Sequence, residues 1–278
     1  MNSNVLIIGG TGKTGRRVVE QLRNNGIIPR VGSRNVAPGF DWNDKDTWVQ
    51  ALEGIEKMYV SYYPDLAIPG AKEAIQSLTV LAKELGVQKM VLLSGKGEKE
   101  AEACEDIVKE SGMDYTIVRA SWFNQNFSES FFLDPVLSGE VALPMSDVLI
   151  PFVDANDIAE VAMTVLLDDQ YNGQTIEVTG PELITFKDAV KMIAQESSRT
   201  LNFHEITLEQ YVDGMNKMGM PADVVWLIEY LFSHVLTNPT NQLIVNDVER
   251  VLGRKAKTFL AYAKETAQTG VWASVEVN

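Results

Sequence analysis

The sequence predicts an α/β protein in which a doubly wound parallel sheet precedes a small, mostly helical C-terminal domain. In the first half of the chain, short apolar runs rich in β-branched residues alternate with segments whose apolar residues recur at the helical period. A glycine-rich turn joins the first apolar run to the first helical segment. The alternation ends near Arg119, and helical periods dominate the C-terminal part of the chain. Together these three observations indicate a parallel sheet covered by helices.

The predicted elements before residue 120 follow one another with short connections. The first strand, Val5–Ile8, is wholly apolar, as expected where both faces of a sheet are covered. The first helix places two valines and a leucine on one side and stops at Gly26, a common helix terminator. Strands are expected at 5–8, 27–32, 58–62, 89–93 and 115–118. Helices are expected at 16–25, 46–52, 71–85 and 100–111, with the acidic run between Glu98 and Glu110 as a solvated face.

The second half of the sequence is less regular. Residues 120–147 combine aromatic residues, asparagines and two prolines without a clean period, which predicts loops that cover a substrate. The next elements are expected to be a strand at 150–153, a helix at 155–167, a strand at 175–179 and an amphipathic helix at 185–196. The N-terminal domain is therefore predicted to span 1–150 and to be completed by roughly 151–180, with 181–278 as the smaller domain.

Composition excludes several classes of protein. Lys and Arg number 24 against 38 Asp and Glu, so the net charge is 24 − 38 = −14, which argues against nucleic-acid or anionic-membrane partners. The single cysteine, Cys104, excludes an intramolecular disulfide and an all-cysteine metal site. His204 and His234 lie too far apart in sequence to suggest zinc, so no metal is expected. With no targeting segment or membrane span visible, a cytoplasmic protein is expected, and its oligomeric state is left open.

The glycine-rich turn predicts a dinucleotide site. Glycines at 9, 12 and 15 would let the backbone turn tightly, approach a pyrophosphate and pack the helix on the strand. The N-terminus of that helix would offer backbone N–H groups to the phosphates, which indicates a Rossmann-type fold. The alternative is a purely structural turn. A nucleotide-triphosphate P-loop is excluded because Ile7 stands where that motif needs glycine, so Lys13 is either a phosphate neighbour or an exposed residue.

Arg34 indicates which dinucleotide is preferred. It follows the second predicted strand, where an acidic residue would hold the ribose hydroxyls of NAD and an arginine accommodates the 2′-phosphate of NADP. A guanidinium binds phosphate through two hydrogen bonds, and Ser33 adds a hydroxyl. The sequence therefore predicts NADP(H), with a solvated arginine as the alternative.

These motifs together resemble the NmrA-like branch of the atypical short-chain dehydrogenases. The resemblance rests on 9–18 (GGTGKTGRRV), 33–34 (SR), 40–42 (FDW), 47–48 (TW), 118–119 (VR) and 152–159 (FVDANDIA). Within the branch, the chain is most similar to the group that contains festuclavine dehydrogenases, and NADPH quinone reductases and triphenylmethane-dye reductases belong to the same branch. The resemblance implies a Rossmann fold, NADP(H) and hydride transfer to a small organic acceptor. It implies a cofactor site made of Gly9, Thr11, Gly12, Lys13, Thr14, Gly15, Ser33, Arg34, Asp41, Trp42, Tyr62, Tyr63, Pro64 and Ser94.

The usual proton donor of the superfamily is missing. Its Tyr-x-x-x-Lys pair lets the lysine lower the tyrosine pKa, yet no tyrosine of this chain is followed by lysine four residues later. One interpretation is an NADPH-dependent reductase whose iminium, quinone or azo acceptor needs little acid catalysis. The other is a redox-sensing protein that binds NADP(H) without turnover. An epimerase-like enzyme on a nucleotide sugar is disfavoured because it relies on the missing tyrosine.

The substrate site is predicted in the segment that follows strand 115–118. Its aromatic walls and amides suit a flat, aromatic or conjugated small molecule, and the alternative is that the aromatics only pack the domains. The residues expected to contact substrate are Trp122, Phe123, Asn124 and Asn126. Ser94 and Lys96 are weak catalytic candidates, and Lys96 is equally well explained as an exposed loop lysine. Both histidines are expected to be structural, and Cys104 is expected to be inert.

Overall fold

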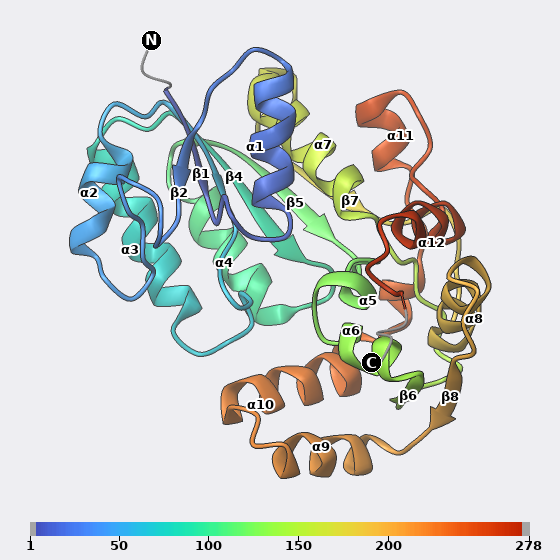
Figure 1. The fold of residues 1–278 in the computed structure, drawn as a ribbon. Helices are drawn as coiled ribbons and strands as arrows, with labels where there is room; N and C mark the ends of the chain where they lie inside the picture. Colours follow the sequence, from blue (N-terminus) through green and yellow to red (C-terminus); the bar gives the residue numbers. More distant parts are fainter. Residues whose placement is uncertain (1–3, 274–278) are drawn as a thin grey trace. The chain divides into compact units, whose positions relative to one another are not determined.

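The computed structural model describes residues 4–273 and contains a six-stranded, wholly parallel sheet (Figure 1). Along the sheet the strand order is β2-β1-β3-β4-β5-β7. The strands are β1 (Val5–Ile8), β2 (Arg30–Gly32), β3 (Lys57–Val60), β4 (Lys89–Gly95), β5 (Asp114–Ala120) and β7 (Gln174–Val178). The chain leaves β1 toward β2 on one side and then crosses to β3 on the other, which makes β1/β3 the switch point of the sheet. Ligands of such sheets bind beyond the carboxyl ends of the strands at this point.

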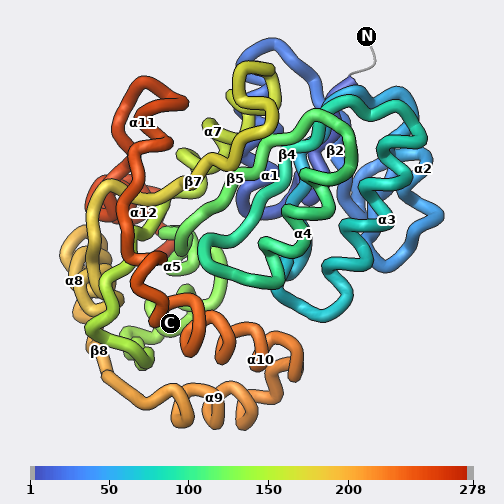
Figure 2. Tube along the Cα trace, turned by 180° about the vertical axis from the view of Figure 1, so that it is seen from behind, coloured from blue at the N-terminus to red at the C-terminus, as the bar shows by residue number. Residues whose placement is uncertain are grey.

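Helices cover both faces of the sheet, which confirms the doubly wound, Rossmann-type prediction. One face carries α2 (Asp46–Leu52), α3 (Ala71–Glu84) and α4 (Lys99–Lys109), and Figure 2 shows α3 and α4 side by side. The other carries α1 (Gly15–Asn24) and α7 (Ala155–Leu167), with α11 (Asp247–Leu252) against α7. Because both faces are covered, all four residues of β1 are buried.

The described residues divide into two compact units, which we call the sheet unit and the helical unit. The sheet unit comprises residues 4–120, 155–178 and 247–254, and the helical unit comprises 121–154, 179–246 and 255–273. This division differs from the predicted boundaries, since residues 121–154 group with the second unit and a late helix returns to the first. The sequence around 120 holds no glycine- or proline-rich linker that marks the crossing.

The helical unit is built around an aromatic core. Phe127, Phe152, Phe186 and Phe259 are buried and pack against one another with ring centroids 5.5–6.4 Å apart. Its helices are α5 (Asn126–Glu129), α6 (Leu133–Ser138), α8 (Phe186–Glu196), α9 (Leu208–Lys217), α10 (Ala222–Tyr230) and α12 (Phe259–Gln268). A two-stranded parallel pair, β6 (Glu140–Leu143) and β8 (Asn202–Glu205), completes it.

Two local predictions were wrong. Residues 120–147 are not merely loops, because they contain α5, α6 and β6. The strand expected at 150–153 is absent: Ile150 and Val153 each form one isolated bridge, to Ile184 and Phe123, while the segment is buried. An apolar run signals burial, and here the burial is against side chains of the helical unit rather than within a ladder. The helices at 46–52 and 155–167, in contrast, have the predicted bounds.

Candidate cofactor site

The glycine loop between β1 and α1 is anchored by its own backbone. The N–H groups of Gly9 and Gly10 both donate to the Gly32 carbonyl, at 3.0 and 3.3 Å, which ties the loop to the end of β2. The Gly12 N–H donates to the Gly9 carbonyl at 2.8 Å and closes the turn. Gly9 has φ +74°, a left-handed conformation that favours glycine. The loop therefore holds its shape without a ligand.

The glycines of this loop are required for different reasons. A β-carbon at Gly15 would lie 2.2 Å from the Gly9 carbonyl oxygen, and one at Gly10 would lie 2.8 Å from the Ile7 carbonyl oxygen. The protein itself therefore forbids side chains at both positions, and Gly10 is a position that the sequence analysis did not single out. A β-carbon at Gly12 would come within 3.1 Å of the Gly9 oxygen and otherwise meet open space. At Gly12, then, one backbone oxygen is the single protein atom that a side chain would meet closely.

Thr14 is held by a buried tyrosine that the sequence analysis missed. The Tyr59 hydroxyl of β3 donates to the Thr14 hydroxyl at 2.8 Å, and both side chains are buried. Burial raises the pKa of Tyr59, so this phenol keeps its proton and acts as the donor. Because Thr14 accepts here, its own hydroxyl proton is available for an acceptor such as a phosphate oxygen.

The end of β2 lies against the glycine loop. The hydroxyls of Thr11 and Ser33 are 2.8 Å apart, so the two predicted cofactor residues are brought together. Arg34 follows directly and is exposed to solvent, free of the core. A side chain in this place can contact a phosphate bound beside the loop, as the sequence analysis expected.

The aromatic residues after β2 and β3 meet one another. The Trp42 ring lies 5.0 Å from Phe40, 5.9 Å from Trp48 and 4.7 Å from Tyr62, measured between centroids. Trp42 and Tyr62 are half-buried. Asp41 forms a turn in which its carbonyl accepts the Trp48 indole N–H at 2.7 Å. The segments that follow β2 and β3, the strands on either side of β1, thus form one aromatic cluster.

Tyr63 and Pro64, which follow Tyr62, are exposed, and Tyr63 is 73% accessible. Lys13 lies in the glycine loop, where its carbonyl accepts a hydrogen bond from Arg17 at 2.6 Å. The structure therefore groups the predicted residues of the loop, of the end of β2 and of Trp42 with Tyr62.

Ser94 and Lys96 belong to a network of buried charges. Ser94 donates to Glu105 at 2.7 Å, and Lys96 pairs with Glu177 at 2.5 Å. Arg119 donates twice to Glu105, at 2.9 and 2.5 Å, and lies 3.5 Å from Glu177. Burial disfavours the ionised form of Glu105, but the hydrogen bonds from Arg119 and Ser94 outweigh it and lower the pKa of the carboxyl. Both weak catalytic candidates are therefore engaged in joining β4, β5, β7 and α4.

The network also corrects the expectation of a fully solvated acidic face on α4. Glu105 is completely buried and Glu98 is only 7% exposed, whereas Glu102 and Glu110 are exposed as predicted. Cys104 is buried beside Glu105, and burial raises the pKa of its thiol to about 12, which fits the expected inertness.

The predicted substrate segment lies in the helical unit. Trp122 is half-buried and packs on Phe132, Phe186 and Phe232, with centroids 5.4–6.3 Å apart. The Asn124 side chain is completely buried, and neither its amide nitrogen nor its oxygen has a hydrogen-bond partner among residues 4–273. Phe123 and Asn126 are half-buried. A buried amide without partners is costly unless a ligand or water meets it.

Neither a cluster of metal-ligating side chains nor a membrane-spanning helix occurs among the described residues. Within positions 4–273, no group of three or more histidine, cysteine, aspartate or glutamate side chains could hold a metal ion. The same part of the chain contains no helix of the length and apolarity needed to span a bilayer.

A parallel sheet of this order, with a glycine loop at its switch point, defines a dinucleotide-binding protein of the Rossmann class. The chain matches the NmrA-like family over residues 98–263 and the NAD(P)H-binding family over residues 9–169. Each match covers more than half of the sequence. The chain belongs to the NmrA-like family, and the sequence-based prediction of that family is confirmed.

Three curated relatives span almost the whole chain. The prestalk A differentiation protein A of Dictyostelium discoideum is 27% identical over 280 residues, covering 95% of this chain and 92% of the relative. The NAD(P)H azoreductase of Xenophilus azovorans is 27% identical over 287 residues, covering 95% and 98%. The festuclavine dehydrogenase of Aspergillus fumigatus is 28% identical over 292 residues, covering 94% and 97%. The group resemblance inferred from the motifs is therefore also confirmed.

A solved structure shares the fold. The NADPH-dependent quinone oxidoreductase of Escherichia coli, crystallised with NADPH, superposes with a TM-score of 0.76 at 17% identity, covering 94% of this chain and 99% of that one. Together with the relatives named as reductases and dehydrogenases, the family places the chain among the NAD(P)H-dependent oxidoreductases.

Proposed function

We propose that this protein is an NADPH-dependent reductase that transfers hydride to a small conjugated acceptor of the iminium, quinone or azo type, without a tyrosine acid. The observation that carries the proposal is the combination of a preformed glycine loop with an absent acid. The relatives named as an azoreductase and a festuclavine dehydrogenase support the acceptor class, since both names refer to small conjugated or heterocyclic molecules.

The residues of the loop fit a dinucleotide. The open space in front of Gly12 would admit the pyrophosphate, and the Thr14 hydroxyl, with its proton left free by Tyr59, would donate to it. Ser33 and Arg34 would contact the adenosine 2′-phosphate, and Asp41 and Trp42 would lie near the adenine. NADPH, when bound, supplies the hydride.

The state of the tyrosines supports an acceptor that needs little acid catalysis. Tyr62 follows the carboxyl end of β3, and burial raises its pKa, with Cys104 and Glu73 adding to the effect. A tyrosine that serves as the superfamily's proton donor needs a lowered pKa instead. Ser94 and Lys96 are bound to carboxylates, so neither offers a free group in its place. An iminium already carries the charge that an acid would create, and a quinone or azo group delocalises the incoming electrons.

The segment 122–126 would bind the acceptor. Trp122 offers an aromatic wall that is partly accessible, and Asn124 offers a buried amide that needs a partner. We expect the acceptor to be aromatic or conjugated for this reason.

The experiment is steady-state oxidation of NADPH, followed by its absorbance, with a panel of quinones, azo dyes and cyclic iminium ions. Turnover with any of them supports the reductase. Tight NADPH binding without turnover across the panel would favour a redox sensor. If the protein bound neither NADPH nor NADH, both the reductase and the sensor would be refuted.

Arg34→Asp is expected to weaken NADPH binding about 100-fold and NADH binding less than about threefold, because it replaces a charge-assisted phosphate contact with repulsion. Calorimetry with both nucleotides measures the difference. Arg23→Asp makes the same charge change at the exposed end of α1 and serves as the control. Equal losses for NADPH and NADH would remove the 2′-phosphate assignment.

Tyr59→Phe is expected to weaken NADPH binding about 3- to 10-fold, since loss of one hydrogen bond of about 1 kcal/mol leaves Thr14 free to rotate. Fluorescence titration with NADPH checks it. Tyr115→Phe, which removes the hydroxyl of a half-buried tyrosine on β5, is the matched control. If both variants bind NADPH as the unmodified protein does, Tyr59 has no part in orienting Thr14.

A further inference from the structure

Two carboxyl groups meet at the carboxyl edge of the sheet. Asp65 lies in the loop after β3, and Glu98 lies between β4 and α4. Their side chains are hydrogen-bonded to each other. Asp65 also accepts the Ala67 N–H at 2.8 Å, which fixes the direction of its carboxylate. The contact joins the loop that follows one strand to the loop that follows its neighbour.

Glu98 is packed into the backbone rather than extended into solvent. Glu98 is only 7% exposed, and a β-carbon at Gly95 would lie 2.0 Å from its Oε1 atom. The carboxyl group therefore occupies the space beside the Gly95 α-carbon. No N–H or hydroxyl group of the described residues donates to the buried Oε2 atom of Glu98.

A hydrogen bond between two carboxyl groups requires a proton, because two ionised carboxylates have acceptors only. No N–H or O–H group of the described residues reaches Oε2 of Glu98, so no protein donor stabilises an ionised carboxylate at that buried atom. Burial raises the pKa of Glu98 well above its ordinary value, and the negative charge of Asp65 raises it further.

The other charges around the pair do not replace this proton. Glu100 and Glu105 of α4 are negative and also raise the pKa of Glu98. Arg119 of β5 is paired with Glu105. On α3, Lys72 lowers and Glu73 raises the pKa of the neighbouring Cys104 thiol, and Glu73 also raises the pKa of Tyr62.

We propose that Asp65 and Glu98 share one proton at neutral pH, and that this proton positions the edge of the sheet at which the nicotinamide end of NADPH binds. The inference rests on the proposed function. Tyr62–Pro64 lead directly into Asp65, and Gly95 ends β4, so the pair fixes both loops that follow adjoining strands. When the proton leaves, two contacting carboxylates repel and the loops separate. Asp65 and Glu98 are positioning residues in this account.

The direction of the pH effect follows from the raised pKa of Glu98. The folded protein holds a proton that the unfolded chain releases near the ordinary glutamate value of 4.5. The pair's contribution to stability is therefore complete below that value and is lost as the pH rises through the folded pKa. NADPH affinity should fall over the same range.

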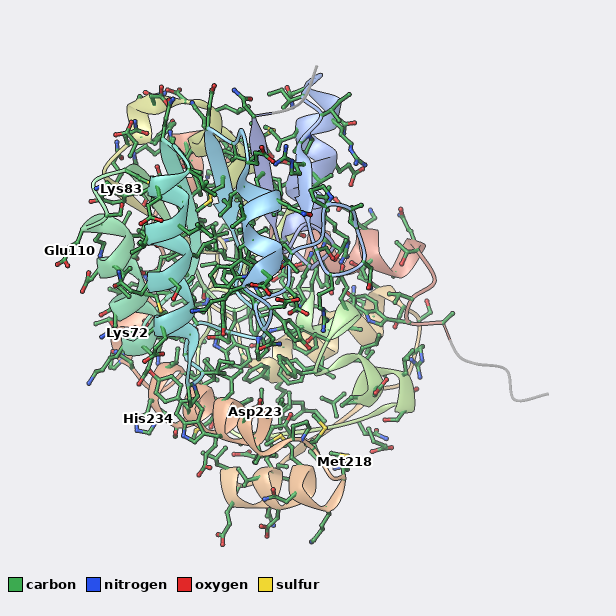
Figure 3. The ribbon with its side chains drawn as sticks, turned by 90° about the vertical axis from the view of Figure 1, so that its left-hand side faces the viewer. Lys72, Lys83, Glu110, Met218, Asp223 and His234 are labelled. Atoms are coloured by element: carbon green, nitrogen blue, oxygen red, sulfur yellow. The ribbon has the colours of Figure 1, made fainter. Side chains whose placement is uncertain are left out.

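The test compares Glu98→Gln with Glu110→Gln. Glutamine can donate to Asp65 at every pH, whereas Glu110, an exposed side chain after α4 that Figure 3 shows at the surface, loses the same charge in contact with solvent. NADPH affinity and the free energy of unfolding in urea are measured from about pH 6 to about pH 9. The unmodified protein and Glu110→Gln are expected to lose about tenfold more NADPH affinity with rising pH than Glu98→Gln does.

Parallel pH profiles for all three proteins would overturn the inference. If the unmodified protein binds no NADPH, the proposed function fails, and the unfolding profiles still decide whether the proton is shared. Infrared spectroscopy gives a second readout on the unmodified protein: a protonated carboxyl band at neutral pH whose frequency shifts in Asp65→Asn, because the hydrogen-bond partner of the proton changes. Absence of that band would overturn the inference even if Glu98→Gln did not fold.

Discussion

Gly12→Val is expected to abolish measurable binding of both NADPH and NADH, with a loss of at least about 100-fold, while the fold remains intact. A β-carbon at this position meets one atom of the protein, the Gly9 carbonyl oxygen at 3.1 Å, and a small adjustment relieves that contact. The remaining methyl groups would fill the space that the pyrophosphate needs. Calorimetric titration with each nucleotide measures the binding. The free energy of unfolding should change by less than about 1 kcal/mol.

Gly15→Ala is the informative comparison, because it adds fewer atoms at a position where the protein has no room. Its β-carbon would lie 2.2 Å from the Gly9 oxygen and 2.7 Å from the Gly9 carbonyl carbon. The loop must shift, so both stability and nucleotide binding should fall, stability by about 1–3 kcal/mol. If Gly12→Val destabilised the protein as much as Gly15→Ala, the empty space before Gly12 would have a structural rather than a ligand-binding explanation. Unchanged nucleotide binding by Gly12→Val would mean that the loop is not the cofactor site.

Gly12 and Gly15 show which features of the loop can be predicted from the sequence and which cannot. The spacing of glycines between a strand and a helix predicts the loop, and the structure confirms the strand, the turn and the helix around it. Spacing does not say which glycine serves the protein and which leaves space for a ligand. That difference depends on distances to the Gly9 carbonyl, which arise only when the helix packs back on the strand.

The burial of two acidic residues could not be predicted in full from the sequence. Glu98 and Glu105 stand in a run of charges that is typical of a solvated helix face. Glu105 is four residues after Ala101 and adjoins Cys104, and both of these residues are buried. The helical period of the sequence therefore already indicates that Glu105 lies on the apolar side of α4. Its partner Arg119 stands on β5, and no local pattern connects the two. Glu98 is buried by Gly95 and Asp65, which again come together only in the folded chain.

The helical unit was predicted least well, for a related reason. Strand β8 is largely exposed and has a histidine and two other polar residues among its four, so it lacks the alternation that marks a strand. It forms because β6 offers an edge to pair with, and β6 itself lies in the segment predicted as loop. Short elements of this kind are fixed by tertiary pairing rather than by propensity.

Glu105→Ala is expected to lower the free energy of unfolding by about 3–5 kcal/mol, the cost of leaving one member of a buried ion pair without its partner. Arg119 would lose two hydrogen bonds and its nearest counter-charge, and the Ser94 hydroxyl would lose its acceptor. Because the network joins β4, β5 and α4, loss of these contacts should destabilise the whole sheet unit. Urea unfolding at neutral pH measures it, and Glu110→Ala on the exposed side provides the control.

The pH dependence distinguishes a lost ion pair from a simple cavity. The pKa of Glu105 is lowered in the folded protein, so its contribution is complete above the ordinary value of 4.5 and is lost as the pH falls through the folded pKa. The stability difference between the unmodified protein and Glu105→Ala should therefore shrink in acid. A cavity left by missing atoms would cost the same at every pH. A difference that stays constant down to acid pH would show that Glu105 stabilises the sheet unit by packing alone, and that Arg119 finds its counter-charge elsewhere.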